Sequence, residues 1–176
     1  MRELIDALLL LARVTQSEVH PVSVDLSALA GEITAGLRVA HPGRDVDVVI
    51  APDPRVRGDR ALLRTRLVNL LDNAWKYTEK RVSARVKIGS LAEAGERVFF
   101  VRDDGAGFDA EHAERLVHPF QRLHSERDFA GTGIGLATAA RIVPRHGGRI
   151  WAVGAVGQGA TFSFVLSEEA RSYDEQ

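Results

Sequence analysis

NLLDNAWKYT, residues 69–78, is the stretch that decides how the rest of this chain is read. It lies in a longer run from Asp59 whose pattern predicts a helix. One stripe of that helix carries amides, an ammonium and a phenol, at Asn69, Asn73, Lys76 and Tyr77. Another carries the apolar residues that should face the core, at Leu67, Leu70, Leu71 and Ala74. A polar stripe is usually a solvated face, but Asn is a poor interior helix former, so we expect these amides to have a ligand.

The composition is that of an ordinary globular domain of 176 residues with a net charge of −1. This charge implies no nucleic-acid partner. The absence of Cys excludes disulfides and thiolate metal sites and fits a cytoplasmic protein. The apolar run at residues 8–12 is too short to span a bilayer, and no cleavage site follows it. We therefore expect no membrane contact by this chain.

Apolar periodicity and the positions of Gly and Pro predict the remaining elements. The predicted helices cover residues 2–18, 25–39, 59–78, 109–117 and 132–146. The predicted strands cover residues 22–24, 45–50, 55–57, 84–88, 97–102, 149–153 and 161–166, with a hairpin turn at Ala94-Gly95 and a short partner for the 45–50 strand at 55–57. This order predicts an α+β fold, a two-layer sandwich of one mixed, mostly antiparallel sheet with about three helices on one face. Residues 21–168 form the domain, between an N-terminal helix in 1–20 and a polar tail in 169–176.

The helix at residues 2–18 has a wide apolar stripe for a terminal element. It either docks on the domain or pairs with a second copy of the chain as a homodimer. Pro144 lies in the last turn of the 132–146 helix and should bend or fray it, and Gly147-Gly148 should close it.

Glycine clusters mark the remaining candidate sites. DDGAGF, residues 103–108, follows an apolar strand, and alone it indicates a turn. GTGIGL, residues 131–136, opens a helix and could offer free backbone N–H groups to a phosphate. It does not follow a strand in a βαβ unit, which disfavours a dinucleotide site, and it lacks the Gly-Lys-Ser/Thr ending of a phosphate loop. The cluster at residues 157–161 alone indicates a hairpin turn. The six His residues do not recur at metal-ligand spacing, and no nucleophile with a neighbouring base is evident.

In this order, the stretches resemble the ATP-binding domain of sensor histidine kinases, within the wider superfamily of gyrase-type ATPases. The match consists of an asparagine box at 69–78, glycine boxes at 103–107 and 131–136, and a phenylalanine box at 119–124. It runs from about residue 22 to 166, and implies the Bergerat ATP-binding fold. The nucleotide-binding residues it implies are Asn69, Asn73, Lys76, Tyr77, Asp103, Gly105, Gly107, Phe108, Phe120, Arg122, Gly131, Thr132, Gly133, Gly135, Leu136 and Thr161.

The resemblance also implies roles. Asp103 would accept a hydrogen bond from the adenine amino group, with Thr161 supporting it through water. Asn73 would bind Mg²⁺ through its amide oxygen, and Lys76 would meet a phosphate. Tyr77 would line the adenine pocket. Residues 118–132 would form a lid, anchored by Phe120, with Arg122 near the phosphates and the glycines of 131–135 as its hinge.

The catalytic residues implied are Asn69, Asn73 and Lys76. Relatives that hydrolyse ATP carry Glu where this chain has Asn69, and an amide is no general base at neutral pH. The resemblance therefore implies slow hydrolysis and transfer of the γ-phosphoryl group to a His on a dimerisation domain, with a response regulator as indirect partner. None of the six His residues lies in the sequence context of that acceptor. Residues 2–19 resemble the second helix of the dimerisation hairpin, which implies a first helix upstream. Asp104 replaces the more usual Asn and should add charge near the phosphates.

Other functions stay open at this stage. One is a serine kinase of the same superfamily, such as an anti-sigma factor, which the N-terminal helix disfavours. Another is a non-catalytic ATP sensor that only changes shape on binding.

Overall fold

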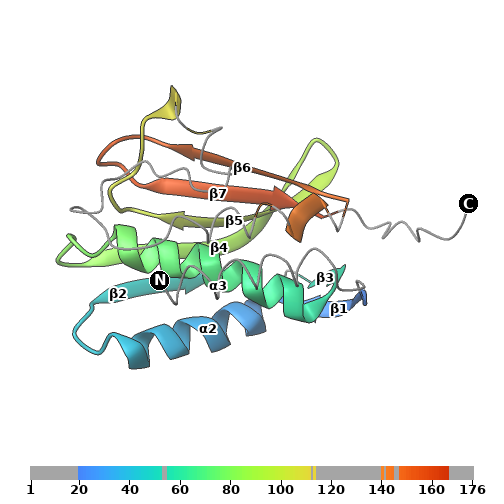
Figure 1. Ribbon diagram of the computed structural model, residues 1–176, viewed down its shortest axis with the longest axis horizontal. Coiled ribbons are helices and arrows are strands. Elements are labelled where there is room, and N and C mark those ends of the chain that lie inside the picture. Colours follow the sequence, from blue (N-terminus) through green and yellow to red (C-terminus); the bar gives the residue numbers. More distant parts are fainter. Residues whose placement is uncertain are drawn as a thin grey trace, which may run out of the picture.

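The computed structural model describes residues 20–52, 55–111, 113, 140, 142–144 and 147–166. In these residues, helices and a sheet form two layers (Figure 1). The elements in chain order are β1 (Val22–Asp25), α2 (Leu26–Ala40), β2 (Val46–Ile50), β3 (Arg55–Gly58), α3 (Arg60–Tyr77), β4 (Ala84–Glu93), β5 (Glu96–Asp103), β6 (Arg149–Gly154) and β7 (Ala160–Val165).

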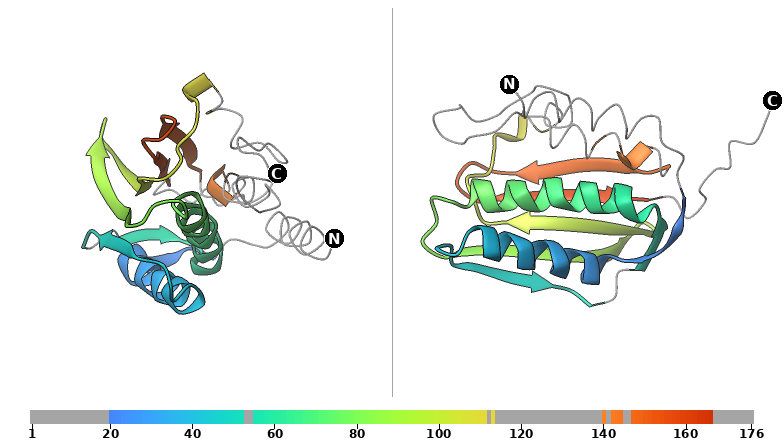
Figure 2. Two further views of the ribbon diagram at one scale, coloured as in Figure 1. Left: turned by 90° about the vertical axis from the view of Figure 1, so that its left-hand side faces the viewer. Right: turned by 60° about the horizontal axis from the view of Figure 1, so that its bottom comes forward.

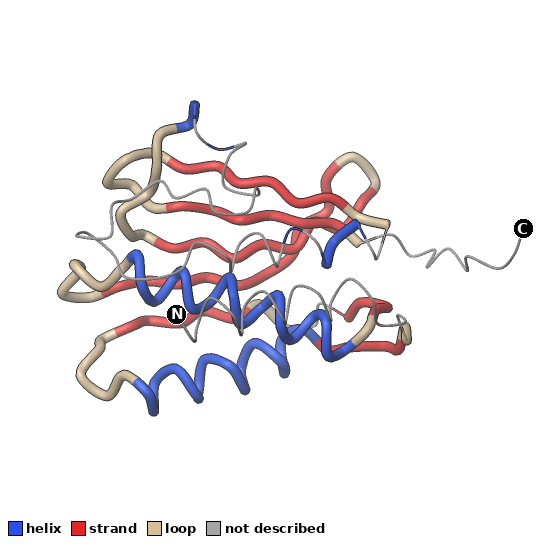
Figure 3. Tube along the Cα trace, viewed as in Figure 1, coloured by secondary structure: helices blue, strands red, loops and turns tan. Residues whose placement is uncertain are grey.

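The main sheet has five strands in the order β2-β4-β5-β7-β6 (Figure 3). Only β2 and β4 pair in parallel, and the other pairs are antiparallel. The predicted hairpin is confirmed, although both its strands run longer than expected. Its turn uses Ala94 and Gly95 with φ of 51° and 81°, the left-handed region in which Gly carries no steric penalty. The predicted α+β sandwich with a mixed, mostly antiparallel sheet is therefore confirmed.

A second, small sheet corrects one prediction. β3 does not pair with the 45–50 strand, as expected, but with β1, antiparallel and with Val22 opposite Gly58. The pattern around Pro52 and Pro54 signals a break but carries no information about the partner strand. Choosing that partner needs the position of α2, which brings β1 back beside β3.

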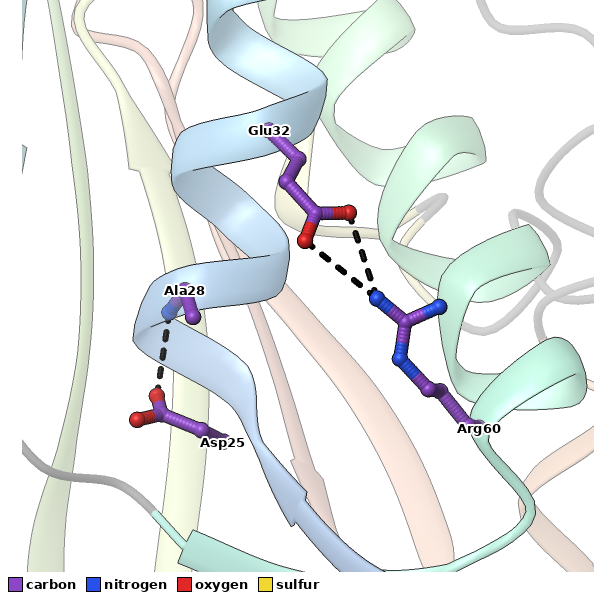
Figure 4. Close-up of polar contacts among 4 residues, drawn as sticks. All are labelled: Asp25, Ala28, Glu32 and Arg60. Carbon is purple, nitrogen blue, oxygen red and sulfur yellow. Dashed lines mark hydrogen bonds and ion pairs between the residues drawn. The ribbon is translucent and has the colours of Figure 1, made fainter.

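Both long helices lie on the same face of the main sheet (Figure 2). Asp25 begins α2 by accepting a hydrogen bond from the N–H of Ala28 at 3.0 Å, and Asp59 begins α3 by accepting from Ala61 and Leu62. Arg60 of α3 pairs with Glu32 of α2 at 3.2 Å, so the two helices are also tied at their exposed edge (Figure 4).

The core lies between these helices and the sheet. The apolar stripe predicted for α3 is confirmed, because Leu67, Leu70, Leu71 and Ala74 are all at most 2% exposed. They pack with buried residues of β4, β5 and β7, including Val86, Val101 and Phe162. This burial fixes which side of α3 is left for the amide stripe.

Several predicted elements fall wholly or largely outside the described residues: the helix at 2–18, the lid at 118–132, the tail, and most of the helices at 109–117 and 132–146. Of the last helix, residues 142–144 are helical, and Ile142 is fully buried beside Leu62. Gly147 has φ 66° and donates to the carbonyl of Pro144, so the predicted glycine closure is confirmed. Among the described helices, none has the length and apolarity needed to cross a bilayer.

Candidate functional site

Asp103 ends β5 and lies at the centre of the candidate site. Its side chain is buried, with 5% of the residue exposed. Burial raises the pKa of Asp103 from 3.8 to about 6, against the opposing effect of backbone hydrogen bonds from Gly105 and Ala160. The N–H of Gly105 donates to Oδ1 of Asp103 at 2.9 Å. A buried carboxyl with a raised pKa at a strand end is typical of a ligand-recognition position.

The loop after Asp103 lies directly against the C-terminal end of α3. The N–H of Ala106 donates to the carbonyl of Tyr77 at 2.9 Å. A Cβ at Gly105 would collide with that same carbonyl oxygen and would stand 2.9 Å from Oδ1 of Asp103. Glycine is therefore required at position 105 for the close approach of the loop to α3.

The β6–β7 turn closes on the other side of this loop. The N–H of Gly157 donates to the carbonyl of Ala106 at 2.7 Å. Gly107 has φ 62°, and a Cβ there would collide with the carbonyl oxygen of Ala155. The glycine clusters at 103–107 and 157–161, which each look like an isolated turn in the sequence, are thus packed together in the fold.

The polar stripe of α3 runs towards this junction. Asn69, Asn73, Lys76 and Tyr77 are all partly buried. The Nζ of Lys76 lies 4.7 Å from the centroid of the Tyr77 ring. Since Tyr77 contacts the loop that follows Asp103, the structure brings the asparagine box and the first glycine box to one place.

Thr161 is not where the sequence analysis expected it. In the β5–β7 register Asp103 faces Ala160, whereas Thr161 faces Arg102. Successive residues of a strand point to opposite sides, so Thr161 lies on the sheet face away from Asp103. There its Oγ1 accepts a hydrogen bond from Nε of Arg102 at 3.0 Å. The expected support of the Asp103 carboxyl by Thr161 is therefore corrected: Ala160 occupies the neighbouring position.

Asp104 of the first glycine box and Phe108, which directly follows the box, both have structural partners. Phe108 is 4% exposed and packs in the core, with its ring centroid 6.3 Å from that of Phe162, so the structure gives it a packing position. Asp104 accepts from the N–H of Arg85 at 2.9 Å, and its own N–H donates to the Arg85 carbonyl. The Asp104 carboxylate thus bonds the loop to β4. We had expected this carboxylate to add charge near the phosphates. The predicted residues that lie outside the described part are Phe120, Arg122, Gly131, Thr132, Gly133, Gly135 and Leu136.

The residues that hold this site together were missed from the sequence. Arg44, in the loop after α2, and Thr78, just beyond α3, both bond to the last turn of α3. Arg81 donates to the carbonyl of Gly157 at 2.9 Å. Thr78 is the last residue of the asparagine box, and this position could have marked it as a site residue. The sequence holds no comparable signal for Arg44, because nothing in it indicates a contact with the distant Trp75.

The arrangement can recognise a ligand with hydrogen-bond donors through Asp103 and hold a hard cation through an amide oxygen of α3. The described residues contain no group of three or more His, Asp or Glu side chains that could form a metal cage. Mg²⁺ fits such a site only when phosphate oxygens and water supply most of its ligands, which is how it usually binds in proteins.

Comparison with known proteins agrees with this geometry. The family described as "Histidine kinase-, DNA gyrase B-, and HSP90-like ATPase" matches residues 58–170. The methanogenesis regulatory histidine kinase FilI of Methanothrix harundinacea is 38% identical over 142 residues, which are 80% of this chain and 15% of that protein. Cyanobacterial phytochrome B of Nostoc is 34% identical over 172 residues, which are 96% of this chain and 23% of that protein.

Among solved structures, full-length ShkA in complex with AMPPNP has a TM-score of 0.74 and 27% identity, covering 93% of this chain and 35% of that one. The chain thus spans less than a quarter of the length of the two curated relatives, 15% and 23%.

Proposed function

Because this chain belongs to the family of histidine kinase-, DNA gyrase B- and HSP90-like ATPases, we propose that it is the ATP-binding catalytic part of a sensor histidine kinase. The observation that carries the proposal is the contact between two candidate boxes. The buried Asp103 ends β5, and the loop after it bonds to the end of the helix that carries Asn73 and Lys76.

Asp103 supplies the base specificity. Its carboxyl accepts a hydrogen bond from the exocyclic amino group of adenine, and it would face a carbonyl acceptor if guanine were bound instead. Leaving a buried polar group without a hydrogen-bond partner costs roughly 1–3 kcal/mol of binding free energy. Asp103 therefore discriminates strongly between adenine and guanine. Tyr77 lies beside the loop and lines the same pocket.

The amide stripe of α3 supplies the phosphate end. The amide oxygen of Asn73 would hold Mg²⁺, with phosphate oxygens and water as its other ligands. Lys76 places a positive charge at the phosphates. When bound, Mg²⁺ neutralises the charge that develops in phosphoryl transfer; the chain itself positions the nucleotide. The lid, with Phe120, Arg122 and the glycines of 131–135, is proposed to close over it.

Asn69 determines the fate of the γ-phosphoryl group. An amide cannot take a proton from water at neutral pH, so hydrolysis by this domain is slow. The acceptor is a His on a dimerisation domain of the parent kinase, which then passes the phosphoryl group to a response regulator. We place the domain in the cytoplasm, where Mg·ATP is available, and assign residues 2–18 to the end of the dimerisation domain.

Calorimetric titration with Mg·ATP tests the binding step. We expect saturable binding by the wild-type chain, weaker binding of Mg·GTP, and at least a tenfold loss of affinity in Asp103→Asn. Asp109→Asn is the matched control, because Asp109 is exposed and accepts a hydrogen bond from the nearby Glu111 N–H. No binding at millimolar nucleotide would contradict the proposal.

A transfer assay tests the reaction. The chain is incubated with labelled ATP and either a His-bearing dimerisation domain or a Ser-bearing partner protein of the kind that an anti-sigma kinase phosphorylates. Acid-labile label on the His protein supports a histidine kinase. Acid-stable label on the Ser protein would instead identify a serine kinase, and binding without any transfer would identify an ATP sensor.

A further inference from the structure

The carbonyl groups of the last turn of α3, residues 74–77, all accept hydrogen bonds. The Ala74 carbonyl accepts from Thr78, that of Lys76 from the N–H of Glu79, and that of Tyr77 from the N–H of Ala106. Helix ends leave such carbonyl groups without a partner unless something supplies a donor. Thr78 and Glu79 directly follow the helix, whereas Ala106, the donor to Tyr77, belongs to a distant loop.

The remaining carbonyl, that of Trp75, accepts from Arg44 and also lies 3.1 Å from the hydroxyl oxygen of Thr78. Nη1 of Arg44 donates to it at 2.9 Å, and Nη2 donates to Oγ1 of Thr78 at 3.0 Å. Thr78 is fully buried and its hydroxyl donates in turn to the Ala74 carbonyl at 2.7 Å. Arg44 is 31 residues from Trp75 in the chain, in the loop between α2 and β2.

The contacts of Arg44 with Trp75 and Thr78, here called the Arg44 brace, are stronger than an ordinary capping contact because Arg44 is charged. A guanidinium at a helix C-terminus interacts favourably with the helix dipole, and its hydrogen bonds are charge-assisted. The two donors belong to one planar guanidinium group and contact Trp75 and Thr78 together. They therefore fix the orientation of the last turn as well as its position.

We propose that Arg44 is a positioning residue for the nucleotide site. It does not touch the nucleotide; it holds the last turn of α3 so that Lys76 and Tyr77 meet the loop that follows Asp103. The proposal rests on the proposed function for its consequence, which is nucleotide affinity. Its structural part, the fixing of the α3 end, can be measured without any nucleotide.

The test uses Arg44→Met, which keeps the length of the side chain but removes its donors, and Arg44→Lys, which keeps the charge and a donor. Arg38→Met is the matched control, since Arg38 is exposed and its Nη2 donates to the Val46 carbonyl at 3.4 Å, away from α3. In Mg·ATP titration we expect about a tenfold loss of affinity in Arg44→Met, about a threefold loss in Arg44→Lys, and less than about a twofold change in Arg38→Met.

A second measurement separates this proposal from the function it rests on. Amide hydrogen exchange of Thr78, whose N–H bonds to the Ala74 carbonyl, should be about tenfold faster in Arg44→Met than in Arg38→Met, with or without nucleotide. If wild type binds no Mg·ATP but exchange changes as expected, the proposed function fails and the brace stands. If Arg44→Met binds within about twofold of wild type, or loses no more affinity than Arg38→Met, the positioning role is wrong.

Discussion

The guanidinium carbon of Arg66 lies 3.4 Å from the centroid of the Phe164 ring, between α3 and β7. Arg66 is fully buried and Phe164 is 1% exposed. The nitrogens of Arg66 find no hydrogen-bond partner within the described part of the chain, and burial lowers its pKa well below the ordinary value. Stacking on an aromatic ring recovers only part of the hydration that a buried cation gives up. We therefore expect Arg66 to lower the stability of the core in which it lies.

Replacing Arg66 by Met should make the domain more stable. Methionine fills a similar volume, adapts to irregular surroundings and leaves no buried charge. Replacing even a buried ion pair by apolar side chains is often neutral or stabilising, by about 1–4 kcal/mol, and a buried charge without a partner has less to offset its lost hydration. We expect the free energy of unfolding, measured in urea, to rise by ~2 kcal/mol in Arg66→Met.

Arg64→Met on the same helix is the control. Arg64 is exposed, so this substitution should change the free energy of unfolding by less than about 0.5 kcal/mol. A clear loss of stability in Arg66→Met, beyond that of Arg64→Met, would mean that the stacking of Arg66 on Phe164 outweighs its lost hydration.

Asp103 should make stability depend on pH in a defined direction. Its pKa is about 6 in the folded protein and 3.8 when unfolded, so the folded state holds the proton more tightly. The stabilising contribution is complete below pH 3.8 and is lost as the pH rises to about 6. Asp103→Asn removes this dependence, and should be more stable than wild type by ~3 kcal/mol above that range, a difference that shrinks towards acid pH.

The same substitution should weaken nucleotide binding, because the amide lacks the charged acceptor. A more stable protein that binds less tightly is the expected result of replacing a residue placed for recognition. Urea unfolding of both proteins at several pH values is the measurement. If the free energies of unfolding of wild type and Asp103→Asn differ by a constant amount from pH 4 to roughly pH 7, the Asp103 carboxyl has an ordinary pKa in the folded protein.

Local pattern was enough to predict the architecture and the residues at its centre. The amide stripe and the apolar stripe of α3 follow from helical spacing, and the burial of Leu70 and Leu71 confirms the second. The β4–β5 hairpin follows from Ala94-Gly95 and the β-rich runs on either side. These features are local, so each sequence segment contains the information that decides it.

The errors concern contacts between distant segments. The face on which Thr161 lies depends on a one-residue choice of register between β5 and β7, and a shift of one residue turns every side chain to the other face. The burial of Arg66 was not predicted at all, because an exposed Arg is ordinary on such a helix and only the packing against Phe164 of β7 buries it. The pairing of β3 with β1 likewise follows from tertiary placement.

Gly105→Ala tests the close approach of the glycine loop to α3. The new Cβ would collide with the Tyr77 carbonyl oxygen and crowd Oδ1 of Asp103, so we expect a loss of about 2–3 kcal/mol in the free energy of unfolding and weaker Mg·ATP binding. Gly36→Ala is the control. A Cβ at Gly36 meets nothing within 4 Å, and the residue lies inside α2, so this substitution should stabilise by about 0.5–1 kcal/mol. Equal effects from both substitutions would contradict the close contact.

The register of β5 and β7 makes a functional distinction between neighbours. Thr161→Val removes a hydroxyl on the sheet face away from Asp103, where it bonds only to Arg102 among its described contacts, and should leave Mg·ATP affinity within about twofold of wild type. Ala160 pairs with Asp103 across the two strands and is only 8% exposed. The larger, branched side chain of Ala160→Val would crowd this buried position and should weaken binding by about tenfold. Calorimetric titration of both variants decides between the positions. If Thr161→Val loses the affinity and Ala160→Val keeps it, then Thr161 reaches the nucleotide and the pairing of Asp103 with Ala160 is wrong.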